Sequence, residues 1–321
     1  MLKESFGHNP RTLLHIAPYL LSRSVPPADI FKRVGVSPSA LLNADGWVSR
    51  ELCFALGSEV NAVTGDRFPG ADIGRRFRLT DLGTWGVAVS GARTVREACL
   101  AAVNGIGLIH QGTDLRFDTE GASGVLSMSF AGRSAAHPQQ HILGALAVLR
   151  GIALLAGAPE AVGAQFVQPY ERAGDRLEET FGPSLAFGCD SDGIVIDRAI
   201  LDFPLPPFDK ATRKHDPLET AERLGVFVKE LLPYGGVTID RVASLLRLSR
   251  RTLQRRLRDF GFSFEELVDD VRRVEAIRRV GIGEESVLEI AFMLGYSDQA
   301  HFTRAFRRWT GLSPRDYARG F

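Results

Sequence analysis

The strongest constraint on the fold of this 321-residue chain is a pattern that occurs twice towards its C-terminal end. Small or apolar residues and a serine recur at an offset of 48 residues, with Val242, Ala243, Leu246, Leu248 and Ser249 matched by Ile290, Ala291, Leu294, Tyr296 and Ser297. Just after each serine the offset becomes 49, so that Leu253, Arg255 and Leu257 are matched by Phe302, Arg304 and Phe306. Each copy has helical spacing, a short break and helical spacing again.

Each part of the repeated pattern has a physical role. The alanine is small enough to let two helices cross closely, and a turn follows within four residues. Ser249 and Ser297 can each accept a hydrogen bond from the free amides of the next helix, as N-cap residues do. The sequence therefore predicts two helix-turn-helix units, at about residues 239–260 and 287–309.

Helical spacing divides the second helix of each unit into an apolar side and a polar side. In the first unit Leu253, Leu257 and Phe260 share one side, and the other carries Arg251, Gln254, Arg255 and Arg258. In the second unit Phe302, Ala305, Phe306 and Trp309 face inward, whereas the predicted outward residues are Gln299, Ala300, His301, Arg304 and Arg308.

The outward residues have the chemistry of major-groove recognition, since arginine pairs with guanine and glutamine with adenine through two hydrogen bonds each. Residues 247–258 hold six arginines and no acid, and residues 236–321 hold 16 basic against 12 acidic residues, compared with 23 against 26 before them. A single basic helix face is usually a solvated surface. Two matched copies, both basic outward and apolar inward, favour DNA binding instead.

A connecting helix is predicted between the two units, at about residues 264–280. At about 1.5 Å per residue it spans roughly 25 Å. That length would hold two recognition helices near the ~34 Å repeat of successive major grooves. One chain is therefore expected to read two adjacent half-sites.

The rest of the chain predicts a second domain of different class. Four prolines interrupt any regular period at residues 202–217, so we place a linker at 206–217, between domains at 1–205 and 218–321. In the first domain we predict helices at 12–22, 28–34, 49–63 and 142–158, and strands at 115–118, 125–130 and 193–197, with a turn at 120–124. After the linker we predict only helices, beginning with 218–232, so the fold class is α+β followed by an all-α domain.

The C-terminal motifs resemble those of the AraC/XylS family of bacterial transcription regulators. The resemblance rests on Leu253-Gln-Arg-Arg-Leu257, Ile290-Ala-Phe-Met-Leu-Gly-Tyr-Ser297 and Phe302-Thr-Arg-Ala-Phe-Arg-Arg-Trp-Thr-Gly-Leu-Ser-Pro314. It implies base contacts from Arg251, Gln254 and Arg255 in the first unit and from Gln299, His301 and Arg304 in the second. Two departures stand out: Arg247 replaces a usual turn glycine, and Ala300 replaces a polar reader, so the second unit is expected to discriminate bases less sharply.

The front domain also resembles a known type, the effector and dimerisation domain called arabinose-binding in some of these regulators. The motifs are Leu82-Gly-Thr-Trp-Gly-Val-Ala-Val-Ser90, Thr94-Val-Arg-Glu-Ala98, Phe187-Gly188 and Leu201-Asp-Phe-Pro-Leu-Pro206. Relatives with this domain answer to diverse small molecules, so the sugar in the name does not transfer. The resemblance also implies contact with RNA polymerase, a homodimer and activation more than repression.

No motif in the sequence indicates a catalytic site, a metal or a cofactor. His137 and His141 have helical metal-ligand spacing, but no third ligand is close in sequence and Pro138 intervenes. The chain lacks the nucleotide-binding, nucleophile-elbow and zinc-protease motifs, and its three cysteines form no pair of metal-ligand spacing. Trp47 and Trp85 are expected to be core residues more than pocket residues.

The sequence thus favours a regulator, and not an enzyme, whose partners are double-stranded promoter DNA and a small-molecule effector. No secretion signal opens the chain and Arg150 interrupts its most apolar stretch, so a cytoplasmic protein without a membrane segment is expected. Two alternatives stay open: a front domain that only dimerises, and an enzyme fused to a DNA-binding module. The sequence identifies neither the effector nor the residues that bind it.

Overall fold

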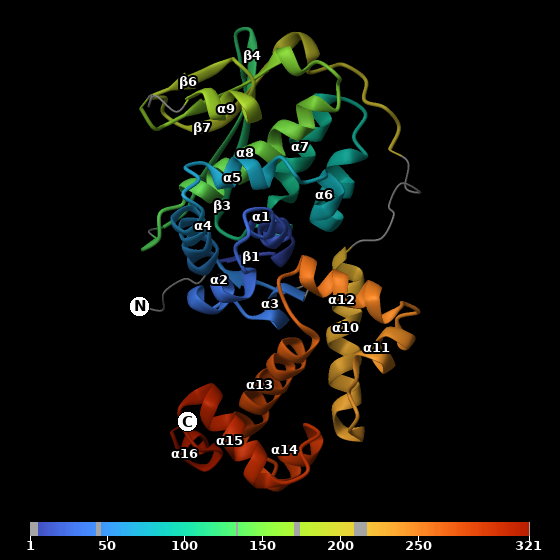
Figure 1. Cartoon of the computed structure of the whole chain (residues 1–321). Coiled ribbons are helices and arrows are strands. Elements are labelled where there is room, and N and C mark those ends of the chain that lie inside the picture. The colour runs from blue at the N-terminus through green and yellow to red at the C-terminus, as the bar shows by residue number, and fades with distance from the viewer. Residues whose placement is uncertain (1–5, 43–45, 133, 170–173, 209–216, 321) are drawn as a thin grey trace. The chain divides into compact units, whose positions relative to one another are not determined.

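The protein divides into two compact units, which are described separately (Figure 1). The computed structural model describes residues 6–42, 46–132, 134–169, 174–208 and 217–320. The front unit comprises residues 1–36 and 44–216, and the C-terminal unit comprises 37–43 and 217–321. Within the described part of the chain, none of the helices is long and apolar enough to cross a membrane.

The front unit is mixed, with helices preceding and surrounding one main sheet. Its longer helices are α1 (Ile16–Ser22), α2 (Pro27–Val34), α4 (Arg50–Thr64), α5 (Pro69–Gly74), α6 (Gly83–Ser90), α7 (Val95–Gly105), α8 (Gln139–Leu154) and α9 (Gly174–Phe181). Short 3-10 helices are η1 (Pro10–Leu13), η2 (Leu79–Leu82), η3 (Ile106–Leu108), η4 (Pro159–Ala161) and η5 (Arg198–Ile200).

The main sheet has five strands in the order β3-β4-β7-β5-β6. They are β3 (Thr113–Glu120), β4 (Ser123–Phe130), β5 (Val162–Phe166), β6 (Leu185–Phe187) and β7 (Asp192–Asp197). All neighbours are antiparallel except β5 and β6. The separate pair β1 (Gly7–His8) and β2 (Val48–Ser49) joins the beginning of the chain to the start of α4.

Helix α8 packs against β5 and β7 and also contacts α4 and α5, as its central place in Figure 1 shows. Two glycine positions allow α5 and α8 to approach so closely. A Cβ on Gly70 would lie 1.9 Å from the Gln140 carbonyl oxygen, and one on Gly74 would lie 2.2 Å from the Gly144 carbonyl oxygen. The two backbones are therefore in contact, and no larger side chain fits between them.

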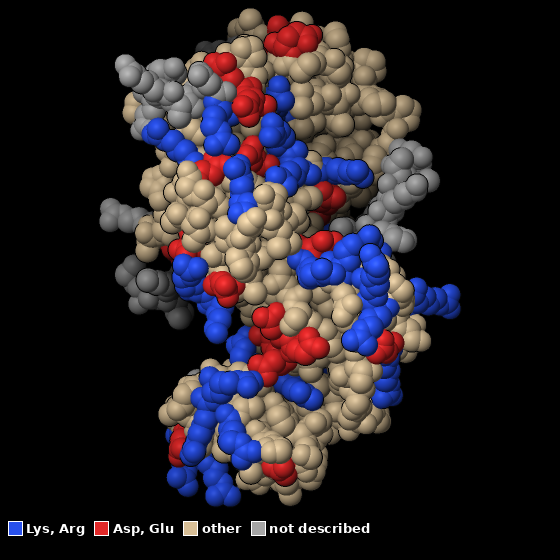
Figure 2. Space-filling model, viewed as in Figure 1, with Lys and Arg blue, Asp and Glu red and all other residues tan. Residues whose placement is uncertain are grey.

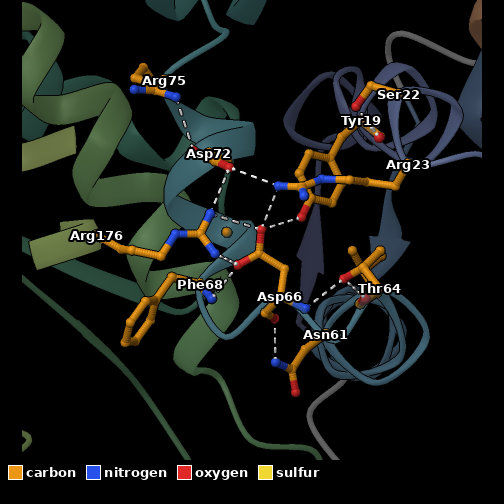
Figure 3. Close-up of polar contacts among 12 residues, drawn as sticks. Tyr19, Ser22, Arg23, Asn61, Thr64, Asp66, Phe68, Asp72, Arg75 and Arg176 are labelled. Atoms are coloured by element: carbon orange, nitrogen blue, oxygen red, sulfur yellow. Dashed lines mark hydrogen bonds and ion pairs between the residues drawn. The ribbon is translucent and has the colours of Figure 1, made fainter. Parts of the chain in front are cut away.

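A buried carboxylate joins helices α1 and α9 to the loop after α4 (Figure 3). Asp66, 4% exposed, accepts hydrogen bonds from Tyr19 Oη at 2.8 Å, Arg23 Nη2 at 2.8 Å and Arg176 Nη1 at 3.0 Å. Burial alone would raise the pKa of Asp66, but hydrogen bonds from the Phe68 amide, Tyr19 and Arg176 outweigh it and hold the pKa below its usual value. The ionised carboxylate therefore stabilises this corner of the unit.

The C-terminal unit contains only helices among its described residues. They are α3 (Pro38–Leu42), α10 (Pro217–Leu231), η7 (Leu232–Tyr234), α11 (Ile239–Leu245), α12 (Arg250–Asp259), α13 (Phe264–Ile282), α14 (Val287–Met293), α15 (Gln299–Thr310) and α16 (Pro314–Arg319). The short helix α3, which the sequence assigned to the front domain, groups with this unit through contacts with α10 and α13.

The α+β class is confirmed, and most predicted elements are present with small shifts in their bounds. The predicted helix 12–22 is wrong as a single element, since a 3-10 turn precedes α1. The hairpin turn is tighter than predicted because Glu120 still pairs with Ser123. Strands β5 and β6 were missed, because each is short and its pairing partner lies far away in the sequence. Most of the predicted linker, residues 209–216, lies outside the described residues.

Candidate nucleic-acid interface

The first helix-turn-helix unit consists of α11 and α12. Ser249 accepts a hydrogen bond from the Thr252 amide at 3.1 Å, so the predicted N-cap is confirmed. Arg247, in the turn, has a φ of +54°. The arginine therefore adopts the left-handed backbone that the turn needs, although this conformation is unfavourable for any residue with a side chain.

The second unit consists of α14 and α15. Its turn contains Gly295, with a φ of +74°, at the position that corresponds to Arg247. The prediction that Ser297 caps α15 is wrong, because Asp298 is the N-cap and accepts from the His301 amide at 2.7 Å. The sequence analysis matched Ser249 to Ser297 at the offset of 48, whereas the observed cap follows the offset of 49 found in the next helix.

Helix α13 joins the two units and extends two residues beyond its predicted end. Its start is fixed by a reciprocal capping box between Ser263 and Glu266. From this helix Arg272 Nε donates to the Leu294 carbonyl at 3.0 Å, and its guanidinium lies 5.0 Å from the Tyr296 ring centre. The connecting helix is thereby bonded directly to the turn of the second unit.

The apolar sides of the two recognition helices are buried as predicted, except that Phe260 and Trp309 are only half-buried. Leu253 and Leu257 in α12 are 1% and 2% exposed, and Phe302 and Phe306 in α15 are both 0% exposed. On the outer sides, Arg251, Gln254, Arg255, Arg258, His301, Arg304 and Arg308 are exposed, and Gln299 is half-buried. On the C-terminal unit, Figure 2 shows basic side chains gathered over α12 and, separately, over α15 and α16.

The outward residues differ in how firmly the protein holds them. Among the described residues, neither Arg251 nor Arg304 forms an ion pair or a side-chain hydrogen bond. Arg308 Nη2, in contrast, lies 2.5 Å from Asp269 Oδ1 of α13, whose other oxygen accepts from Trp309 Nε1 at 3.0 Å. His301 Nδ1 lies 3.2 Å from its own helix cap, Asp298. The second unit therefore presents a more constrained polar face than the first.

The front unit contains a cavity of about 810 Å³, its opening included. Apolar residues of η1, α4 to α6 and α8 form most of its wall, and the main polar groups are Thr12, Gln140, His110 and His141. Trp85 is both a core residue, 1% exposed, and part of this wall, with its indole donating to the Ala102 carbonyl at 3.0 Å. Trp47 is 43% exposed, so the expectation that it belongs to the core is wrong.

Three histidines also lie together here, a grouping that the sequence analysis did not predict. His137 and His141 have no third metal-ligand residue close to them in the sequence, but in the fold His141 lies with His8 and His110, and the ligand atoms of these three are within 4.8 Å of one another. His137, its expected partner by helical spacing, is exposed and outside the cluster. No sequence signal marks this grouping, because β1, the segment that follows η3 and α8 are brought together only by the fold.

Comparison with known proteins agrees with both halves of this architecture. The family model "Arabinose-binding domain of AraC transcription regulator, N-term" matches residues 25–205, and a helix-turn-helix domain model matches residues 242–320. An uncharacterized HTH-type transcriptional regulator of Mycobacterium tuberculosis is 30% identical, covering 92% of each chain. The ornithine utilization regulator of Pseudomonas aeruginosa is 27% identical, covering 94% of this chain and 92% of its own.

Among solved structures, the transcriptional regulator CdpR of Pseudomonas aeruginosa matches 79% of this chain and 88% of its own, at 22% identity and a TM-score of 0.34. That score is too low to support an argument about detail. The family of this chain is instead shown by the two family models and by the relatives of similar length. The chain belongs to the AraC family of DNA-binding transcription regulators, with an arabinose-binding-type domain before its helix-turn-helix domain.

Proposed function

We propose that α12 and α15 enter successive major grooves of promoter DNA and that α12 makes the sharper base contacts. The observation that carries this proposal is the exposed polar side of α12, where Arg251, Gln254 and Arg255 lie opposite the buried Leu253 and Leu257. Guanine and adenine edges match these arginine and glutamine side chains. Gln299, His301 and Arg304 supply the corresponding contacts from α15.

Arg258 and Arg308 have a different role in this proposal. Both are exposed at the later turns of their helices, and Arg308 is already paired with Asp269. Because base contacts come mainly from the N-terminal residues of a recognition helix, arginines of its last turn suit phosphate contacts better. We therefore assign these two residues to the DNA backbone.

The experiment begins with selection of binding sites from a random duplex library by the full chain. Binding of the selected duplex and of its scrambled version is then measured by fluorescence anisotropy. Arg251→Ala should weaken the selected duplex about 5- to 150-fold, corresponding to about 1–3 kcal/mol, and leave the scrambled duplex nearly unchanged. Arg278→Ala, an exposed arginine of α13 paired with Glu275, serves as the control. Equal binding of both duplexes by the unmodified chain would rule out sequence-specific reading.

For the front unit we propose control by a small, predominantly apolar effector in this cavity, whose mostly apolar wall with a few polar groups is typical of ligand sites. Its described wall contains no Asp, Glu, Lys or Arg. A charged amino acid such as ornithine, or a sugar with many hydroxyls, would leave polar groups unpaired there. A hydrophobic molecule with one or two polar groups could instead bond to Gln140, His110 or His141.

Effector binding is proposed to shift a homodimer towards the state that activates transcription with RNA polymerase. The test is thermal denaturation of the full chain with a panel of apolar metabolites, because a ligand at about 100 times its Kd stabilises by about 2.7 kcal/mol. Val148→Phe, which fills the cavity, should abolish the shift, and Leu154→Phe, at the exposed end of the same helix, should preserve it. No shift with any apolar compound would favour a front domain that only dimerises.

A further inference from the structure

Three histidines from distant parts of the chain meet beside the cavity. His8 belongs to β1, His110 follows η3, and His141 is in the first turn of α8. His8 and His110 are 0% and 5% exposed, and an isolated β-bridge joins their backbones. His141 is half-buried and, with His110, forms part of the cavity wall.

One pair of imidazole nitrogens has the spacing of two ligands on one ion, and all three ligand nitrogens lie within 4.8 Å of one another. His110 Nε2 and His141 Nε2 are 3.3 Å apart. Two nitrogens bound at about 2.0–2.1 Å to one tetrahedral zinc ion lie about 3.3–3.4 Å apart. The ring centres of His110 and His141 are 5.0 Å apart, as for two imidazoles on one ion, whereas the His8 ring stacks on His110 at 4.1 Å and lies 4.4 Å from His141, so His8 must turn to bind the same ion.

The ring nitrogens of this cluster lie in a buried environment, which favours neutral imidazoles. Burial, together with the neighbouring imidazoles, lowers the pKa of His8 and His110 far below the usual range, and burial followed by the charge of Arg50 lowers the pKa of His141 to about 4. A neutral imidazole has a free lone pair for a metal. Both ring nitrogens of His8, and Nδ1 of His110, are buried without a hydrogen-bond partner among the described residues.

We propose that His8, His110 and His141 bind one transition-metal dication of the Zn²⁺ class, with the fourth coordination position facing the cavity. A set of three imidazoles without carboxylates suits zinc, cobalt, nickel or copper and does not suit magnesium or calcium. Because His110 and His141 form part of the cavity wall, a polar group of a bound molecule can reach the ion. The metal site itself stands independently of the proposed effector and of DNA reading.

Arg50 limits the affinity of this site and provides a second test of it. The Arg50 side chain is 4% exposed, stacks 4.5 Å from the Phe6 ring centre and donates to the Gly112 carbonyl at 3.4 Å. Its charge is close enough to depress the pKa of both His8 and His141. The same charge repels a dication, so its removal should strengthen metal binding, whereas loss of a ligand should weaken it.

The experiment uses the untagged full chain, stripped with a chelator and titrated with Co²⁺ while visible absorption is recorded. We expect one Co²⁺ per chain with the strong absorption of a four-coordinate site, displaced by Zn²⁺ and unaffected by Mg²⁺. His141→Gln and His110→Gln should each weaken binding by roughly 100-fold or more. Arg50→Gln should strengthen it by roughly tenfold.

His137→Gln is the matched control, since His137 is exposed and four residues before His141. It should bind Co²⁺ like the unmodified chain, and circular dichroism verifies that every variant is folded. The proposal is overturned if the unmodified chain gives no four-coordinate spectrum. It is equally overturned if folded His141→Gln and His110→Gln bind as well as His137→Gln, which would indicate adventitious surface binding. Neither result bears on DNA binding, which anisotropy measures separately.

Discussion

The two helix-turn-helix units have the same buried pattern but hold their outward residues differently. In the first, α12 presents Arg251 without an ion pair among the described residues, and Arg247 adopts the strained turn conformation. In the second, a glycine makes the turn, His301 contacts the cap residue Asp298, and Arg308 contacts Asp269 of the connecting helix α13. The two units therefore share their buried residues but not the contacts of their outward residues.

Replacing the turn glycine should give the largest effect. A Cβ on Gly295 would lie 2.7 Å from the Leu232 carbonyl oxygen, and the φ of +74° disfavours any side chain. We expect Gly295→Ala to destabilise the C-terminal unit by about 2–4 kcal/mol. Hydrogen exchange of α14 and α15 by mass spectrometry measures this, with Arg247→Ala as the control at the equivalent turn. If hydrogen exchange showed similar protection in both variants, the two turns would not differ in their need for glycine.

The second-largest effect should be a difference in DNA affinity between variants of the two matched arginines. Arg255 and Arg304 occupy equivalent places, but we expect only Arg255→Ala to cost about 1–3 kcal/mol at a single base position. Arg304→Ala should reduce the binding free energy by less. Ala300 cannot contact a base through a polar group and His301 is bound to Asp298, so the second unit has fewer base contacts. Anisotropy with duplexes varied one base pair at a time gives both values. Equal losses would mean that both units discriminate equally well.

A smaller effect is expected from releasing Arg308. Asp269→Asn removes the carboxylate charge beside Arg308 but keeps an oxygen for the Trp309 indole. Affinity for all duplexes should rise a few-fold, and the salt dependence should steepen by up to about one phosphate contact. Arg258→Ala should change the slope in the opposite direction. An unchanged slope in Asp269→Asn would remove Arg308 from the proposed phosphate contacts.

The smallest effect concerns the cap of α15. The hydrogen bond from the His301 amide lowers the pKa of Asp298, so the charged cap contributes stability above the usual aspartate pKa and loses it as the pH falls through the lowered value. Asp298→Asn keeps a good N-cap without this titration. The melting temperatures of the two proteins should differ slightly at neutral pH and converge as the pH falls below the usual aspartate pKa of about 3.9 and through the lowered one. A constant difference across this range would exclude the titration.

The accuracy of the sequence analysis depended on how local each interaction was. Leu253 and Phe302 could be assigned to buried sides because helical spacing alone separates the two faces. Asp298 was missed as a cap because the preceding serine was equally suitable in type, and only the backbone distinguishes them. The pairing of Arg308 with Asp269 connects residues 39 positions apart and gave no periodic signal.

The sequence by itself determined the repeated helix-turn-helix pattern, the basic outer sides of α12 and α15 and the family, since each depends on residues within a few turns of one another. Only the tertiary structure decided where the cavity lies, which outward arginines are ion-paired and that His8, His110 and His141 meet. The reason is physical: local spacing sets the faces of a helix, but the contacts of those faces depend on how distant segments pack.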